Sequence, residues 1–91
     1  MAKPHLMVEY YDLVKRRELW RRLAERPRNV RFEEVDQLLR LSGWKLNHVR
    51  GSHYVYRSPE GRHLSIPRHG SPVKPGYVRA VLGYTRGPGD E

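Results

Sequence analysis

Three short runs of β-forming residues between positions 44 and 67 constrain the fold of this chain more than any other feature. The runs cover residues 44–49, residues 53–57 and residues 62–66. Glycine-containing connections of only three and four residues separate them, and connections this short join antiparallel strands rather than parallel ones. The sequence therefore predicts a three-stranded antiparallel meander. Side-chain alternation in the first strand predicts that Trp44, Leu46 and His48 lie on one face of the sheet.

Helical periodicity flanks this meander on both sides. Apolar residues recur at three- and four-residue steps over residues 10–25 and 32–41, and again over residues 75–82. Gly43 suits a helix C-cap, and Pro75 suits the first position of a helix. The predicted order is α-α-β-β-β-α, an α+β fold. Its last five elements form an α-β-β-β-α unit with both helices on one face of the sheet, which leaves the other face free for a charged polymer.

A chain of 91 residues has room for one domain with one modest core. We divide it into a mostly helical N-terminal extension (residues 1–27), a central domain (residues 28–84) and a flexible tail (residues 85–91). Residues 1–8 are expected to be loosely ordered. No internal repeat or second domain is evident in the sequence.

The charge balance points to a polyanionic partner. Eighteen Lys and Arg residues oppose ten Asp and Glu residues, which gives a net charge of +8. Nucleic acid is the commonest partner of such a basic domain, and an acidic protein is the alternative.

The chain has no cysteine, which excludes disulfides and a cysteine nucleophile and favours a cytoplasmic location. Its sequence contains no apolar run long enough to span a membrane, and acidic residues near its start argue against a signal peptide.

Four of the five histidines fall within residues 48–69. Histidine is the usual proton shuttle in RNA cleavage, because its pKa lies near neutrality. His53 is the strongest candidate, since it opens a strand directly after Gly51 and Ser52, whose backbone and hydroxyl groups can bind phosphate oxygens. Arg50 adds positive charge. The alternative interpretation of His53 is a partly buried strand histidine satisfied by a backbone carbonyl.

Other candidate residues support this site less directly. His69 is a second proton-transfer group, a phosphate ligand or a plain loop residue, and Lys45 is a candidate phosphate ligand. His48 and His63 are expected on the sheet surface. A metal site is disfavoured because His48 and His53 flank a hairpin turn rather than one helical face. A nucleophilic triad lacks a suitable acid beside a Ser-His pair.

Residues of about 30–83 resemble the HicA toxin family, also described as YcfA-like proteins. The resemblance is carried by Leu38-Leu39-Arg40-Leu41-Ser42-Gly43-Trp44, Arg50-Gly51-Ser52-His53-Tyr54-Val55-Tyr56, Leu64-Ser65-Ile66-Pro67-Arg68-His69 and Val73-Lys74-Pro75-Gly76-Tyr77-Val78-Arg79-Ala80-Val81-Leu82. It implies a double-stranded-RNA-binding-domain-like fold and ribosome-independent mRNA cleavage without a metal or other cofactor. It also implies that His53 is the catalytic histidine and that a HicB-type antitoxin covers the active-site face.

Two further functions stay open beside this mRNA interferase. One is a non-catalytic RNA-binding module, because fold does not determine function. The other is an interaction protein whose basic face meets an acidic partner. The N-terminal helix lies outside the resemblance, and three roles are open for it: packing on the domain, homodimerisation and extension of the RNA-binding surface.

Overall fold

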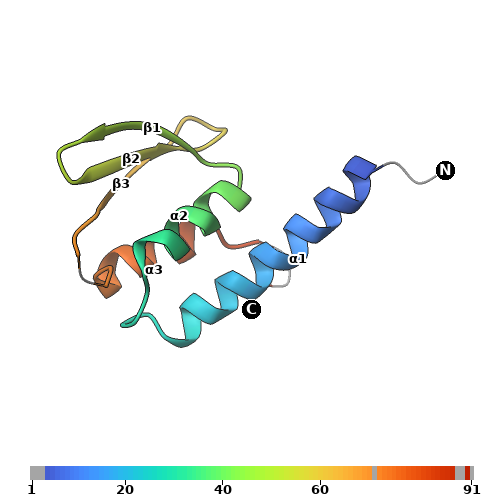
Figure 1. The fold of residues 1–91 in the computed structure, drawn as a ribbon, viewed down its shortest axis with the longest axis horizontal. Helices are drawn as coiled ribbons and strands as arrows, with labels where there is room; N and C mark the ends of the chain where they lie inside the picture. Colours follow the sequence, from blue (N-terminus) through green and yellow to red (C-terminus); the bar gives the residue numbers. More distant parts are fainter. Residues whose placement is uncertain (1–3, 71, 88–89, 91) are drawn as a thin grey trace.

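A computed structural model of the chain describes residues 4–70, 72–87 and 90. Its elements are α1 (Pro4–Glu25), α2 (Phe32–Leu41), β1 (Lys45–Arg50), β2 (His53–Arg57), β3 (His63–Pro67) and α3 (Pro75–Tyr84) (Figure 1). The predicted α+β fold class and the order α-α-β-β-β-α are confirmed. From α2 to α3 the chain forms the α-β-β-β-α unit of a double-stranded-RNA-binding-domain-like fold. Strands β1 and β3 each lie one residue later than predicted.

The three strands form one antiparallel sheet in the order β1-β2-β3. In the hairpin between β1 and β2, Arg50 pairs with His53, and Gly51 has a φ of 58°, a left-handed conformation that glycine adopts at no steric cost. On the other side, His53 pairs with Pro67. The backbone N–H of Arg68 donates to the carbonyl of Ser52 at 2.7 Å. His53 is therefore held in the middle strand, at one end of the sheet.

A β-bulge in β1 determines which side chains face away from the core. The register shifts between Leu46 and His48, so that Leu46 pairs with Tyr56 whereas His48 pairs with Val55. Paired residues point to the same side of a sheet, and Tyr56 is buried in the core. Val55 and Tyr56 are neighbours in β2 and point to opposite sides, so His48 lies on the side opposite Leu46. The prediction that His48 shares a face with Trp44 and Leu46 is therefore wrong. The extra residue of the bulge breaks the alternation that this prediction assumed.

Helices α2 and α3 both lie on one side of the sheet, as predicted, and no described helix covers the other side (Figure 1). The apolar stripe of α2 is buried beneath the sheet. This helix ends at Leu41 with Ser42 as its C-cap, and Gly43 follows with the left-handed φ of 90° that was expected at the end of the helix. The buried apolar core contains Leu19, Trp20, Leu23, Val30, Phe32, Val35, Leu38, Leu39, Trp44, Tyr56, Ile66, Val73, Val78 and Val81.

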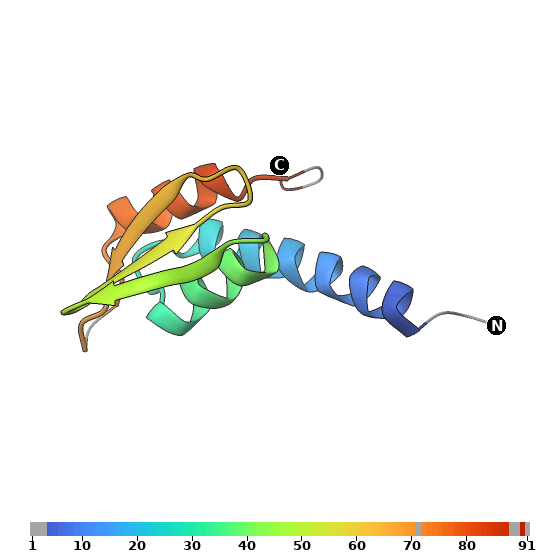
Figure 2. The ribbon, with the colours of Figure 1, turned by 90° about the horizontal axis from the view of Figure 1, so that it is seen from above.

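Helix α1 begins earlier than predicted, since the backbone of residues 4–8 is helical rather than loose. Proline is well tolerated in the first turn of a helix, and extending an existing helix is much easier than nucleating one. Among the α1 side chains that the structure describes, those in the apolar core are Leu19, Trp20 and Leu23, all in the C-terminal half of the helix. The indole N–H of Trp20 donates to the carbonyl of Leu82 in α3 at 3.0 Å. The N-terminal half extends beyond the rest of the domain (Figure 2).

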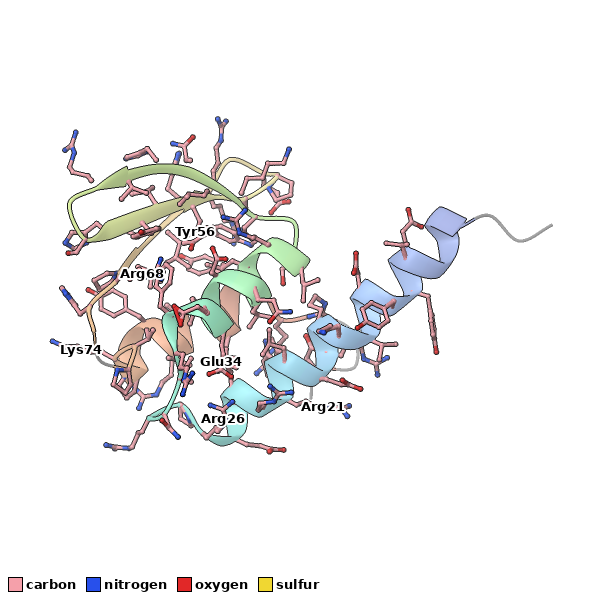
Figure 3. All side chains as sticks on the ribbon, in the orientation of Figure 1. Arg21, Arg26, Glu34, Tyr56, Arg68 and Lys74 are labelled. Atoms are coloured by element: carbon pink, nitrogen blue, oxygen red, sulfur yellow. The ribbon has the colours of Figure 1, made fainter. Side chains whose placement is uncertain are left out.

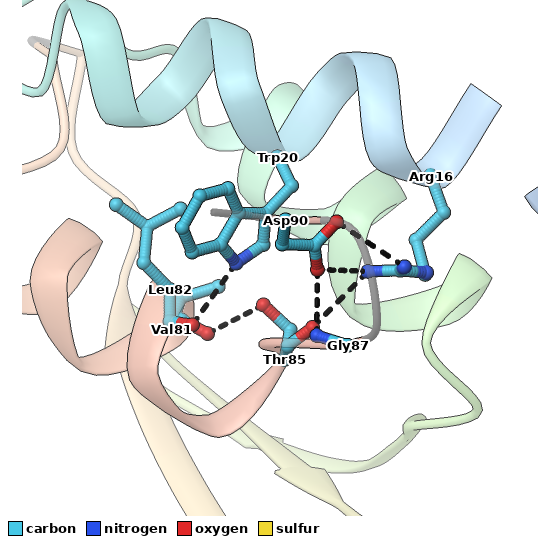
Figure 4. Close-up of polar contacts among 7 residues, drawn as sticks. All are labelled: Arg16, Trp20, Val81, Leu82, Thr85, Gly87 and Asp90. Atoms are coloured by element: carbon cyan, nitrogen blue, oxygen red, sulfur yellow. Dashed lines mark hydrogen bonds and ion pairs between the residues drawn. The ribbon is translucent and has the colours of Figure 1, made fainter. Parts of the chain in front are cut away.

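Residues 85–91 are expected to be a flexible tail, yet Thr85 and Asp90 are buried. Asp90 accepts hydrogen bonds from the guanidinium of Arg16 at 2.8 and 3.3 Å, and from the backbone N–H of Gly87 at 2.6 Å (Figure 4). Arg16 also donates to the carbonyl of Thr85 at 3.2 Å. The described part of the tail thus packs against α1. The sequence did not predict this contact, because 74 positions separate Arg16 from Asp90.

Candidate functional site

The hairpin between β1 and β2 places His53 at an exposed end of the sheet. Its exposure means that it is not the partly buried histidine of the alternative interpretation. Arg50 is its cross-strand partner, and the side chains of paired residues lie on the same face. Gly51 is exposed, with no atom near the position a β-carbon would occupy. The turn therefore brings an imidazole, a guanidinium and open backbone together.

A small pocket of about 140 Å³ lies beside His53. We call it the His53 pocket, and its lining residues are His53, Pro67, His69, Pro72, Val73, Lys74 and Tyr77. Two imidazoles, an ammonium group and a phenol therefore border one cavity. All four residues are exposed to solvent. The arrangement can hold an anion, and it offers two imidazoles, the side chain most often used for proton transfer in catalysis.

The loop between β3 and α3 is anchored so that it completes the His53 pocket. The backbone N–H of Val73 donates to the carbonyl of Val30 at 2.8 Å, and the Val73 side chain is buried. This contact fixes the start of α3 beneath the end of the sheet. Lys74 immediately precedes α3, and its labelled position in Figure 3 lies at the opposite side of the molecule from the free end of α1.

Arg68 is the first residue of that loop, and its side chain anchors the loop to the domain. Its guanidinium lies 4.8 Å from the ring centroid of Phe32 and 5.6 Å from that of Tyr54, and it pairs with Glu33 at 3.2 Å. The hydrogen bond to the Tyr54 hydroxyl is the main cause that raises the pKa of Arg68 above its usual value. Arg68 thus stays charged and holds the loop against α2. Its neighbour His69 borders the pocket.

The sequence-predicted site residues fall into two groups. Arg50, Gly51, Ser52 and His53 lie together in the hairpin, and His69 borders the same pocket as His53. Lys45 does not join them, because it pairs with Arg57 at the opposite end of β2. Arg57 is four residue steps along the strand from His53, a distance of about 13 Å.

Lys74 is the cation beside His53 that sequence reasoning missed. Its place directly before a predicted helix was evident in the sequence. However, no sequence signal showed that the intervening loop returns the start of α3 to the hairpin. Tyr77 was assigned to the apolar stripe of the last helix, and it too borders the pocket.

The sheet surface away from the helices carries a band of basic side chains. We call this surface the outer face, and strand register assigns to it Lys45, His48, Arg50, His53, Arg57 and His63. All six are exposed, and side chains project from the uncovered side of the sheet in Figure 3. This face can attract the phosphates of a polyanion.

Most aromatic residues of the central domain are structural. Trp44 and Tyr56 belong to the core, and the Tyr56 hydroxyl donates to Asp36 at 2.6 Å. Burial, followed by this hydrogen bond, raises the pKa of Tyr56 well above its usual value. Tyr54 is half-buried against Phe32. Tyr77 is the aromatic side chain that the His53 pocket offers to a ligand.

Within the described residues, no three His, Asp or Glu side chains converge in a group that could hold a metal ion. None of the helices in that same part of the chain has the length and apolar character needed to cross a membrane.

A family model described as the HicA toxin of bacterial toxin-antitoxin matches residues 32–85, which is more than half of the chain. This chain belongs to the HicA toxin family. The match confirms the resemblance noted from the sequence. In this HicA chain, the matched segment runs from the first residue of α2 to the residue after α3, so it contains the whole His53 pocket and leaves α1 outside. Comparison with curated proteins and with solved structures gives no significant match.

Proposed function

We propose that this HicA chain is the toxin of a type II toxin-antitoxin system and acts as a ribosome-independent mRNA interferase, with His53 as its catalytic residue. Membership of a toxin family supports the toxin role. The observation that carries the nuclease assignment is the His53 pocket, in which His53, His69 and Lys74 border one small cavity at the end of a basic sheet. These are the groups that metal-independent RNA cleavage requires.

The reaction is a transfer of the phosphoryl group within the RNA. One imidazole removes the proton from a ribose 2′-hydroxyl, and the 2′-oxygen attacks phosphorus. The bond from phosphorus to the 5′-oxygen breaks, and a protonated group gives its proton to that leaving oxygen. The products are a 2′,3′-cyclic phosphate and a 5′-hydroxyl. Each such proton transfer accelerates a reaction by about 10²–10⁴-fold.

His53 is one of the two proton-transfer groups in this scheme, and His69 is the candidate for the other. Their shared pocket supports this assignment. Lys74 and Arg50 supply positive charge for the phosphate, whose negative charge grows in the transition state. Gly51 and Ser52 offer the backbone N–H groups and hydroxyl of the turn as further donors.

The outer face supplies the wider binding surface for RNA. Its Lys and Arg side chains contact the phosphates that flank the cleavage site, while Lys45 and Arg57 hold the strand about 13 Å from His53. Such contacts release counterions, so RNA affinity falls steeply with added salt. We assign Lys45 to this role rather than to the phosphate that is cleaved.

A HicB-type antitoxin is the expected protein partner. An acidic surface would pair with the cations of the outer face and cover the His53 pocket. Binding of this kind would exclude RNA by competition for the same charged groups, so antitoxin and RNA would not bind together.

The proposal is tested by incubating the purified chain with RNA and analysing the ends of the products. We expect cleavage in the presence of a metal chelator, with 2′,3′-cyclic phosphate and 5′-hydroxyl ends. His53→Ala should slow cleavage by about 100-fold or more while it retains RNA binding. Products with other ends, or undiminished cleavage by His53→Ala, would contradict the proposed chemistry.

The second candidate is a non-catalytic RNA-binding module, which the basic outer face favours independently of the His53 pocket. This function predicts salt-sensitive RNA binding by the wild-type chain without any product. The same assay therefore separates the two functions.

A further inference from the structure

The N-terminal half of α1 presents apolar side chains that the domain does not cover. Five of the seven residues 8–14 are apolar or aromatic. The largest exposures are those of Tyr10 at 71%, Tyr11 at 61%, Val8 at 57% and Leu13 at 48%. These side chains are spread around the helix, but Tyr10 and Leu13 are three positions apart and therefore adjoin on its surface. Exposed apolar side chains that adjoin are a feature of interaction sites. The feature is independent of the His53 pocket, because this part of α1 lies outside the segment that the family model matches.

Charge is distributed unevenly along the same helix. Its N-terminal half carries the acidic residues Glu9 and Asp12, whereas residues 15–25 contain five basic and two acidic residues and are therefore basic on balance. Two such helices that lie antiparallel bring the acidic half of each onto the basic half of the other. A parallel pair would instead place like charges together, which is unfavourable.

Three residues of α1 form a stripe with the symmetry that an antiparallel pair needs. Glu9, Leu13 and Arg17 follow one another at four-residue steps, and residues with this spacing lie on one side of a helix. Leu13 stands midway between the acid and the base. Glu9 and Arg17 of one helix are about 12 Å apart along its axis, so they cannot pair with each other within the same chain.

We propose that two copies of this chain associate through α1, with the helices antiparallel and crossing at Leu13. Each Leu13 contacts the same residue of the other copy, and Tyr10 adds apolar surface beside it. Each Glu9 pairs with Arg17 of the other copy, so the two-fold axis generates two identical ion pairs. A two-fold interface requires such a self-complementary surface.

This interface leaves the proposed active site open. The free end of α1 and the end of the molecule that carries Lys74 lie on opposite sides (Figure 3). A pair of copies would therefore present two His53 pockets facing away from the shared helices. RNA cleavage and self-association can thus be tested separately.

The test measures molecular mass by sedimentation equilibrium over a range of protein concentrations. The wild-type chain should reach twice the protomer mass of 10.8 kDa. Glu9→Arg and Arg17→Glu should each weaken association by roughly tenfold or more, because each replaces two ion pairs with two like-charge contacts. The double variant Glu9→Arg/Arg17→Glu exchanges the charges and should restore the dimer.

Glu60→Arg is the matched control, since it makes the same charge change in the exposed turn between β2 and β3 and should leave the dimer intact. Circular dichroism shows whether each variant keeps its helices. A wild-type chain that stays monomeric at all concentrations would overturn the proposal. So would single variants that dimerise like the wild type, or a folded double variant that remains monomeric.

Discussion

Tyr56 allows a prediction that tests the packing of the sheet against α2. Its ring is fully buried, and its hydroxyl donates to the Asp36 carboxylate at 2.6 Å. Replacement by phenylalanine keeps the ring and removes only this hydrogen bond. Hydrogen bonds to charged groups contribute about 1.5–3 kcal/mol, so Tyr56→Phe should lower the free energy of unfolding by about 2 kcal/mol at neutral pH.

The pH dependence of this difference follows from the raised pKa of Tyr56. Burial is the main cause of the increase above the usual value of 10.0, and the hydrogen bond to Asp36 adds to it. A phenol whose folded-state pKa is raised stabilises the fold fully below its ordinary pKa. That stability is lost as pH rises, because the unfolded chain ionises while the folded chain does not. The loss is about 1.4 kcal/mol for each pH unit above 10.

Urea unfolding of the wild type and of Tyr56→Phe, at about pH 8 and about pH 11, measures this effect. Other tyrosines and lysines titrate in both chains, so the difference between the chains isolates Tyr56. The stability gap of about 2 kcal/mol should shrink by about 1.4 kcal/mol at the higher pH. A gap that stays constant, or that widens, would refute the inference that the folded-state phenol is held protonated.

Two further predictions concern the ends of the domain. Asp90→Ala leaves the buried Arg16 without its carboxylate partner, so it should lower the free energy of unfolding in urea by about 3 kcal/mol. A decrease below about 1 kcal/mol would mean that the tail does not pack against α1. The Glu34 carboxylate pairs with Arg26 and accepts from the backbone N–H of Arg31, and its pKa is lowered first by the hydrogen bond from Arg26. This contribution is present above pH 4.5 and is lost as pH falls below it. Glu34→Gln should therefore be about 1 kcal/mol less stable at neutral pH and less sensitive to acid, whereas parallel pH profiles for the two chains would contradict this.

The sequence predicted the architecture well, because local patterns determine it. Alternating side chains, glycine turns and helical periodicity specify the six elements and their order. The left-handed Gly43 and the helix that begins at Pro75 both follow from simple conformational rules. The predicted and observed bounds of an element differ where the sequence carries no local signal, as at the start of α1.

Predictions were less complete where they depend on the exact strand register or on contacts between residues that are far apart in the sequence. One extra residue in β1 moved His48 to the outer face, and bulges of this kind leave little trace in a sequence. The pairing of Arg16 with Asp90 joins opposite ends of the chain. Lys74 reaches the His53 pocket only because the loop after β3 folds back onto the hairpin.

The candidate site itself was predicted in part. The hairpin with His53 was recognised from a turn that leads into a strand, and His69 was recognised as a second histidine of the central domain. Their common pocket is a property of the fold, since 16 positions separate them. Lys45, the candidate phosphate ligand, lies away from that pocket, because it pairs with Arg57 at the other end of β2.

The central claim is that His53 moves a proton during RNA cleavage, and the most direct measurement compares cleavage rates of His53→Ala and His63→Ala. Both residues are exposed on the outer face, but strand register places His63 opposite Arg57, away from the His53 pocket. Loss of a proton-transfer group should slow cleavage by about 100-fold or more for His53→Ala, while His63→Ala should stay close to the wild-type rate. Equal cleavage rates for the two variants would contradict the account.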